Sequence, residues 1–181
     1  MPSTSDGLSA QAISSGLKTR YLGRCLTHLT IATSTMDVAA VQARDGAPEG
    51  MVVITDQQTT GRGRFQRRWI SPSGQSLYLS IVLRPRIEHL MALGIVASLA
   101  AVRAIHRTTG LSPTIKWPND VEIAGRKLAG ILVDSTVGAT GIEYAVVGIG
   151  LNVALDPRQH PEIAGIATSL AYASGKPVER L

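Results

Sequence analysis

The sequence predicts an α+β domain, in which a mostly antiparallel or mixed sheet carries helices on one side. Two observations lead to this fold class. Of the 181 residues, 44% are hydrophobic and 17% are charged, which is typical of one globular domain with a sizeable core. Hydrophobic and turn residues then alternate in an order that suits helices and strands, one long helix, and a final run of short strands.

The first half of the chain supplies the helices and the first strands. Thr33, Ser34 and Thr35 are residue types that cap helix N-termini, and a helical pattern follows them. Alternate residues of 77–83 are Leu or Ile, a period of two that predicts a strand. The expected order is a helix over 8–17, a strand over 21–31, a helix from 36 that ends at 46, strands over 51–55 and 77–83, and a helix over 88–107 that is apolar nearly all round and should pack on the sheet.

The second half reads as a meander of strands. A short strand over 114–116 leads into a turn at 117–120, and a hairpin over 121–127 turns at Ala124 and Gly125. Longer strands over 128–134 and 142–149 follow, joined by a Gly/Thr turn. Pro177 predicts the start of a last helix, because proline suits the first helical turn.

Charge and composition exclude several classes of protein. The net charge of +5 would suit nucleic-acid binding, but there is no zinc-finger spacing, aromatic platform or basic helix, so we expect no DNA partner. Cys25 is the only cysteine, which fits a reducing cytoplasm, and we expect a buried, inert thiol. We recognise no signal peptide, and the apolar run 90–102 is too short to span a bilayer, so we expect no membrane. The four histidines give no metal-ligand pair, which leaves any metal site unknown.

A cationic, glycine-rich segment is the most informative part of the sequence. Residues 59–69 read Thr-Thr-Gly-Arg-Gly-Arg-Phe-Gln-Arg-Arg-Trp. Glycine lets the backbone approach a ligand closely, and the planar guanidinium of arginine matches carboxylate and phosphate oxygens. We therefore expect a loop that closes over an anion. It is not a Walker A loop, because no Lys-Ser/Thr pair follows, and Gln66 stands where a GxGxxG pattern requires its third glycine.

Three further segments carry cations, glycines or amides. Lys116 ends a strand beside the turn at 119–120, and a buried ammonium needs a partner. Lys127 precedes an apolar strand in which Gly130 leaves room for a ligand, and the strand end at 148–152 has two glycines and an amide. None of these segments supplies a nucleophile with an adjacent base. The set suits phosphate chemistry, in which positioning and charge neutralisation do the catalysis.

Together these motifs resemble those of a known family. From about residue 15 to its end, the chain is similar to the catalytic domain of biotin protein ligases, which implies a class II synthetase-like fold of the biotin/lipoate ligase type. The combination of Lys-Trp-Pro-Asn-Asp with Gly-Arg-Gly-Arg is highly specific. The matching segments share that family's order and spacing: Ser34–Met36, Gln58–Arg64 with Trp69, Lys116–Asp120, Arg126–Leu132 and Gly148–Asn152.

The resemblance implies a two-step reaction and a set of residue roles. Biotin and ATP, with Mg²⁺, would give biotinyl-5′-adenylate and pyrophosphate, and a lysine of a biotin carboxyl carrier protein would then take the biotinyl group. The implied catalytic residues are Arg64, Lys116 and Lys127. The implied biotin-binding residues are Ser34, Thr35, Met36, Gln58, Arg62, Gly63, Arg64, Lys127 and Gly130, and the implied ATP-binding residues are Arg62, Arg64, Trp69, Lys116, Asn119 and Asn152.

The same resemblance frames the domain organisation and two alternatives. We expect residues 1–181 to form one catalytic domain of a cytoplasmic ligase, without an N-terminal DNA-binding domain and without the family's small C-terminal β-barrel domain. A homodimer stays open. One alternative is a lipoate ligase of the same superfamily. The other is a truncated, non-catalytic module that binds biotin or a nucleotide.

Overall fold

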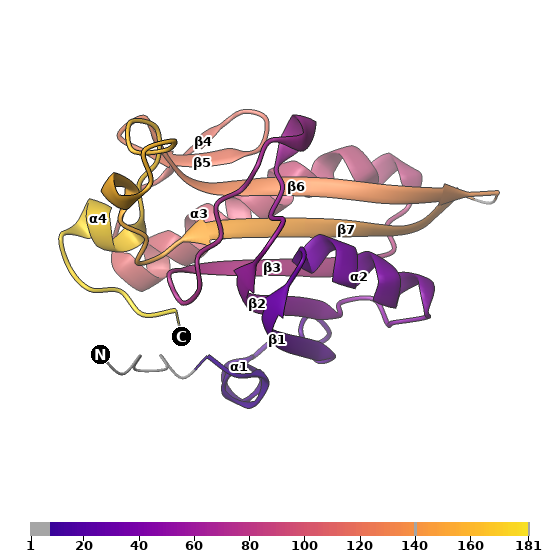
Figure 1. Ribbon diagram of the computed structural model, residues 1–181. Coiled ribbons are helices and arrows are strands. Elements are labelled where there is room, and N and C mark those ends of the chain that lie inside the picture. Colours follow the sequence, from indigo (N-terminus) through magenta and orange to yellow (C-terminus); the bar gives the residue numbers. More distant parts are fainter. Residues whose placement is uncertain (1–7, 140, 181) are drawn as a thin grey trace.

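One mixed sheet of seven strands organises the protein, as a computed structural model that describes residues 8–139 and 141–180 shows (Figure 1). The strand order is β1-β2-β3-β7-β6-β5-β4, and only β1 and β2 pair in parallel among the described neighbours. The predicted α+β class is confirmed. The strands are β1 (Leu26–Ala32), β2 (Val52–Gln58), β3 (Ser76–Leu83), β4 (Thr114–Lys116), β5 (Asp120–Ile123), β6 (Arg126–Gly138) and β7 (Gly141–Asn152).

The helices begin and end at the residue types that favour these positions. Ser34 lies at the N-cap of α2 (Thr35–Arg44), where its hydroxyl accepts a hydrogen bond from the backbone N–H of Met36. Gly110 ends α3 (Leu93–Thr109) in the left-handed conformation that suits glycine. The other helical elements are α1 (Ala10–Gly16), α4 (Leu170–Ser174) and three short 3₁₀ turns, η1 (Arg64–Gln66), η2 (Ile87–Ala92) and η3 (Pro157–Gln159).

The two main helices cover opposite faces of the sheet. Val82 and Val146 pack with α2, whereas their sequence neighbours Leu83 and Val147 pack with α3. Side chains of consecutive strand residues point to opposite faces, so α2 lies in front of the sheet and α3 behind it in Figure 1. This differs from the predicted placement of helices on one side. The physical reason is that the central strands bury apolar side chains on both faces, and each face needs a cover.

The outer face of α3 differs from the expected all-round packing. Ser98 and Ile105 are buried against the sheet, but Ile95, Val96 and Leu99 are exposed. By length and composition alone, the continuous helical segment Ile87–Thr109 could cross a membrane, which the shorter apolar run did not suggest. In the structure this segment lies along the sheet and packs against β4, β5, β6 and β7.

Three local predictions also differ from the structure. The strand expected over 21–31 begins only at Leu26, because a turn with Gly23 at φ +76° precedes it. The helix expected at Pro177 is not formed within the described residues, and α4 lies just before it. Cys25 is exposed instead of buried, since it stands at the end of that first turn.

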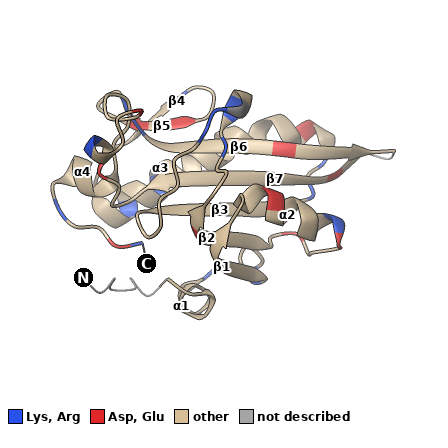
Figure 2. Cartoon of the chain, in the orientation of Figure 1, with Lys and Arg blue, Asp and Glu red and all other residues tan. Residues whose placement is uncertain are grey.

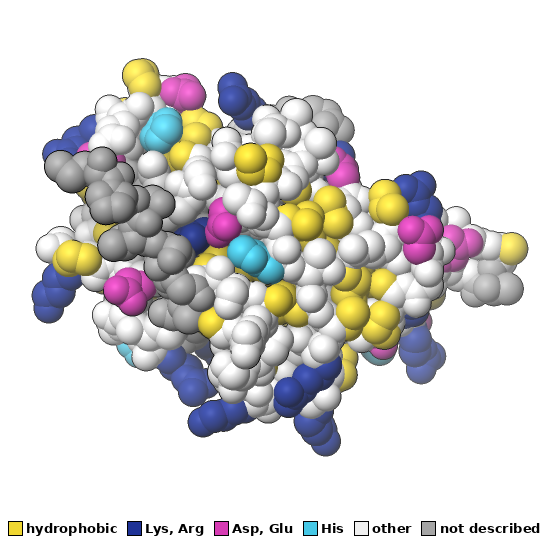
Figure 3. Space-filling view, turned by 60° about the horizontal axis from the view of Figure 1, so that its bottom comes forward, with side chains coloured by type: hydrophobic (Ala, Val, Ile, Leu, Met, Phe, Trp, Pro, Cys, Tyr) yellow, Lys and Arg dark blue, Asp and Glu magenta, His cyan; other side chains and the backbone are white. Residues whose placement is uncertain are grey.

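The charged side chains are unevenly placed. Figure 2 shows basic residues in the loop between β2 and β3, and acidic residues on α2 and β6 near the path of that loop. On the face drawn in Figure 3, Lys and Arg side chains project mainly around the outline, while hydrophobic side chains gather between them. The loop between β2 and β3 therefore brings positive charge over the sheet, where the side chains of the candidate site lie.

Candidate active site

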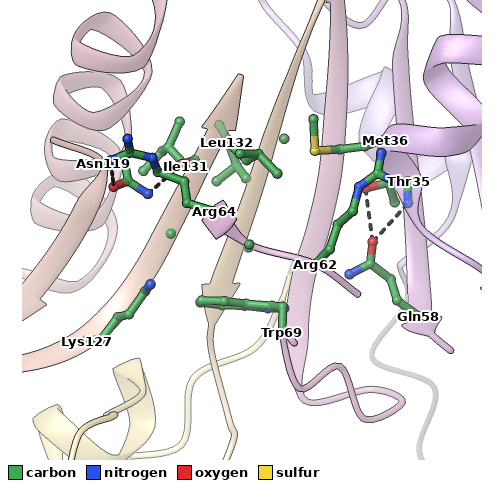
Figure 4. A pocket seen from close by; sticks show the side chains of 15 residues that line it. Thr35, Met36, Gln58, Arg62, Arg64, Trp69, Asn119, Lys127, Ile131 and Leu132 are labelled. Carbon is green, nitrogen blue, oxygen red and sulfur yellow. Dashed lines mark hydrogen bonds between the residues drawn. The ribbon is translucent and has the colours of Figure 1, made fainter. Parts of the chain in front are cut away.

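A hollow on the α2 face of the sheet brings most of the predicted residues together (Figure 4). It is a shallow hollow, partly open to solvent, and it is lined by both polar and apolar side chains. Glycines make its floor: Gly130 of β6 lies opposite Gly150 of β7, and Gly148 follows at the next position on the same face. Because these three positions lack side chains, Met36 and Trp69 can lie over the strands.

Trp69 fills the room above two of those glycines. A Cβ atom added at Gly150 would lie 2.7 Å from the indole ring, and one added at Gly130 would lie 3.0 Å from it. The room that the sequence assigned to a ligand at Gly130 is thus occupied by the Trp69 ring and by Lys127, whose Nζ lies 5.2 Å from the ring centroid. The buried indole N–H has no hydrogen-bond partner among the described residues, so a ligand acceptor could satisfy it.

A chain of hydrogen bonds fixes the polar side of the pocket. Gln58 Oε1 accepts a hydrogen bond from the backbone N–H of Thr35 at 2.9 Å, and Gln58 Nε2 donates to Ser71 Oγ at 3.0 Å. The hydroxyl of Thr35 accepts a hydrogen bond from the buried Ser80 at 2.8 Å. These contacts hold the amide at the end of β2 and the hydroxyl at the start of α2 in defined orientations, which favours recognition of a polar, uncharged group.

The loop of residues 59–69, called the Gly-Arg loop below, crosses the pocket and is closed by its own main-chain hydrogen bonds. The backbone N–H of Trp69 donates to the carbonyl of Gly61, and that of Gly63 donates to the carbonyl of Arg67, both at 2.8 Å. Gly61 is required here, because an added Cβ would lie 2.6 Å from the Trp69 carbonyl. These main-chain bonds close the loop on itself beside the pocket, while Phe65 at its tip stays exposed to solvent.

Two arginines of this loop point to different neighbours. Arg64 Nη1 donates to Asn119 Oδ1 at 3.3 Å, and Asn119 Nδ2 in turn donates to the carbonyl of Ile131 at 3.0 Å. Arg62 instead reaches Asp37 and Asp134. Figure 4 shows both side chains at the edge of the hollow, with Arg64 on the Asn119 side and Arg62 on the Met36 side.

Lys127 is held through both its side chain and its backbone. Its Nζ lies 2.8 Å from Asp120 Oδ1, although this contact is not aligned as a hydrogen bond. Its backbone N–H donates to the carbonyl of Ile166, and its carbonyl accepts from the N–H of Thr168, each at 2.8 Å. The ammonium is therefore held at the rim of the pocket, where a ligand anion could replace the carboxylate of Asp120.

Three of the predicted residues do not line this pocket. Ser34 is buried behind it as the α2 cap, and Asn152 donates to the carbonyl of Thr168 at 2.9 Å. Lys116 is largely exposed and bonds to Glu122 at 2.7 Å, a hydrogen bond that raises the pKa of the lysine. The predicted residues that do line the pocket are Thr35, Met36, Gln58, Arg62, Gly63, Arg64, Trp69, Asn119, Lys127 and Gly130.

The sequence interpretation missed two kinds of residue. Ile131, Leu132 and Ile149 line the pocket beside the floor glycines, and their positions next to Gly130 and Gly148 were the available signal. The carboxylates that pair with the site's cations were also missed. No sequence signal linked Asp37 to Arg62, because the fold alone brings α2 to the loop.

The match to a family of known proteins covers this whole site. The model of the biotin/lipoate A/B protein ligase family matches residues 29–152, and every residue that lines the pocket lies in that range. The chain belongs to this family. The biotin protein ligase likeness predicted from the motifs is confirmed, since two of the three relatives described next are biotin ligases by name.

Three relatives show how far the likeness extends. The bifunctional ligase/repressor BirA of Bacillus subtilis is 39% identical over 176 residues, which are 96% of this chain and 54% of BirA. The biotin–[acetyl-CoA-carboxylase] ligase of Paracoccus denitrificans is 37% identical over 129 residues, 69% of this chain and 53% of that ligase. The structure of the Aquifex aeolicus biotin protein ligase in complex with biotin and ATP superposes with a TM-score of 0.74 at 33% identity, covering 87% of this chain and 64% of that one. The chain spans about half the length of the curated relatives.

The expectations about a DNA partner, the domain boundaries and a homodimer stay predictions. BirA of Bacillus subtilis is named a ligase and repressor, so the expected lack of a DNA partner stays a prediction. The domain boundaries and a homodimer also stay predictions.

Proposed function

We propose that this domain activates biotin with ATP and transfers the biotinyl group to a lysine of a biotin carboxyl carrier protein in the cytoplasm. The observation that carries the proposal is the meeting of Lys127 and Arg64 with the Thr35–Gln58 pair in one pocket. The uncharged ureido ring of biotin needs hydroxyl and amide partners. The biotin carboxylate, which reacts with a triphosphate, needs cations. The relatives named as biotin ligases support the same substrates.

Two bond exchanges make up the proposed reaction. In the first, a carboxylate oxygen of biotin bonds to the α-phosphorus of ATP while the bond to pyrophosphate breaks. In the second, the amine nitrogen of the carrier lysine bonds to the biotinyl carbonyl carbon, AMP leaves and the amine loses a proton. Neither exchange requires a nucleophile from the enzyme, which agrees with a pocket of cations and amides.

The pocket residues would lower the repulsion between the two reacting anions. Lys127 would release Asp120 and take the biotin carboxylate, and Arg64 would release Asn119 and take the α-phosphate. Lys116, exposed at the end of β4, would reach the outer phosphates. The loop across the pocket would limit the access of water to the mixed anhydride.

Three predicted residues receive modified roles in this proposal. Trp69 would form the wall against which the ligand lies, with its indole N–H available to an acceptor. Ser34 would act by capping α2, and Asn152 by holding the segment that fixes Lys127. Both would be positioning residues.

Mg²⁺ fits this chain only as a companion of the nucleotide. Among the described residues, no three His, Cys, Asp or Glu side chains gather as a group that could hold a metal ion. Mg²⁺ keeps much of its water and is commonly bound through substrate phosphates. We therefore expect it to enter with ATP.

Release of pyrophosphate tests the proposal directly. The chain is incubated with ATP and biotin, with ATP and lipoate, and with ATP alone, and pyrophosphate is measured over time. We expect release with biotin only, and a biotinyl group on an added carrier domain. Release with lipoate instead would make the chain a lipoate ligase, and stabilisation by biotin without any pyrophosphate would make it a non-catalytic binding module.

A further inference from the structure

We infer that Asp37 and Asp134 are positioning residues that clamp the Gly-Arg loop across the pocket through Arg62. Arg62 Nη2 lies 2.7 Å from Asp37 Oδ1 and 3.7 Å from Asp134 Oδ2. The sequence assigned Arg62 to biotin and ATP. The contacts give its guanidinium a different task, which is to fasten the loop to the body of the domain.

The clamp joins three elements that are separate in the sequence. Asp37 is in the first turn of α2, Asp134 is on β6, and Arg62 follows β2. Both contacts are ion pairs of the same guanidinium nitrogen, whose positive charge can attract two carboxylates at once. All three side chains are partly exposed, at 34% for Arg62, 41% for Asp37 and 55% for Asp134, so each ion pair alone contributes little. Acting on one guanidinium, the two pairs together can hold a short loop.

The opposite side of the loop has its own, weaker attachment. Arg64 bonds to the amide of Asn119 at 3.3 Å, and no carboxylate within 4.0 Å of its guanidinium is found among the described residues. An anion near Arg62 would meet two negative charges for one positive charge. An anion near Arg64 would meet a positive charge with only a neutral partner to displace. The two arginines therefore divide the work: Arg62 fastens the loop and Arg64 remains available to the ligand.

The loop backbone needs such a fastening. Phe65 is in the left-handed region at φ 57° and ψ 34°, and its side chain is 80% exposed. A bulky residue in this region is strained, and it persists only where the surroundings hold it. Phe65 itself has little packing to hold it, apart from the Arg64 guanidinium 4.9 Å from its ring centroid. The main-chain hydrogen bond from Gly63 to Arg67 closes the turn around Phe65, and the ion pairs of Arg62 fasten that turn to the body of the domain.

Trypsin can report the clamp without any ligand. It cuts after arginine, and the loop offers Arg62, Arg64, Arg67 and Arg68. Cleavage follows the population of open loops when opening is fast, so the double variant Asp37→Asn/Asp134→Asn should be cut in the loop about 3–10 times faster than the parent. Asparagine keeps the shape of aspartate and removes its charge. The matched control is Glu162→Gln, which removes one negative charge at an exposed position far from the loop in sequence and should leave the rate unchanged.

A second cleavage site separates a clamp from a general loss of stability. Mass spectrometry of the early fragments distinguishes cuts in the loop from cuts after Arg103 in α3, which require unfolding of the helix. We expect only the loop cuts to accelerate. Equal loop rates in the parent and the double variant would overturn the inference, and so would a parallel rise at Arg103 or the same rise in Glu162→Gln. Because neither biotin nor ATP is present, a failed ligase assay would leave this result standing, and a failed clamp would leave the proposed reaction standing.

Discussion

Gly150 offers the most direct test of how the pocket is built. An alanine Cβ at this position would lie 2.7 Å from Cε2 and Nε1 of Trp69, whereas ordinary contacts lie at 3.4–4 Å. The ring would have to move by about 1 Å, and overpacking of this kind typically costs about 1–3 kcal/mol. The ring also covers Gly130 and lies beneath Lys127, so its displacement would reach the ammonium proposed to hold biotin.

Tryptophan fluorescence measures this displacement. The chain has two tryptophans, and Trp117 is 79% exposed, so Trp117→Phe leaves Trp69 as the reporter at little expected loss of stability. In that background, Gly150→Ala should shift the emission spectrum, lower the free energy of unfolding by about 1–3 kcal/mol, and weaken biotin binding by about tenfold. The matched control is Gly165→Ala, where an added Cβ meets no atom within 4 Å. Parent-like emission and stability in Gly150→Ala would refute the placement of Trp69 over this glycine.

Three further predictions follow from the site and the core. Lys127→Ala should slow adenylate formation by about 10²–10³, measured by pyrophosphate release, because it removes one positioned charge; an unchanged rate would contradict its role. Arg64→Ala should leave the melting temperature of the free protein nearly unchanged and release adenylate faster, and a large drop in melting temperature would show a structural role instead. Burial raises the pKa of Tyr78 to about 12, so its neutral form stabilises the folded state fully below pH 10. Between pH 10 and 12 the unfolding free energy should fall by about 2–3 kcal/mol, a slope that Tyr78→Phe should reduce in denaturant titrations.

The parts of the fold that follow from local signals could be predicted from the sequence. The Ser34 cap and the period of two in β3 each depend on a few neighbouring residues, and both are present in the structure. The side of the sheet that each helix covers could not be predicted in this way. Because β3 and β7 bury apolar side chains on both faces, their pattern predicts strands but does not indicate which face α2 or α3 covers.

The candidate site shows the same division. Motif resemblance brought together Thr35, Gln58, Arg64 and Lys127, which do line one pocket. It could not indicate the direction of Lys116, because that side chain is on an edge strand and is directed by its ion pair with Glu122 of the neighbouring β5. The ion partners of Arg62 were equally invisible, since they come from elements that meet only in the folded chain.

The main-chain hydrogen bonds of Lys127 limit how far this domain can be shortened at its C-terminal end. The family match ends at residue 152, yet the peptide groups on both sides of Lys127 are bonded to Ile166 and Thr168. Cutting the chain at that boundary would remove these two main-chain hydrogen bonds and leave the buried amide of Asn152 without its acceptor. Engineered fragments based on the matched residues should therefore extend through α4, where Leu170 joins the same core cluster as Leu128 of β6.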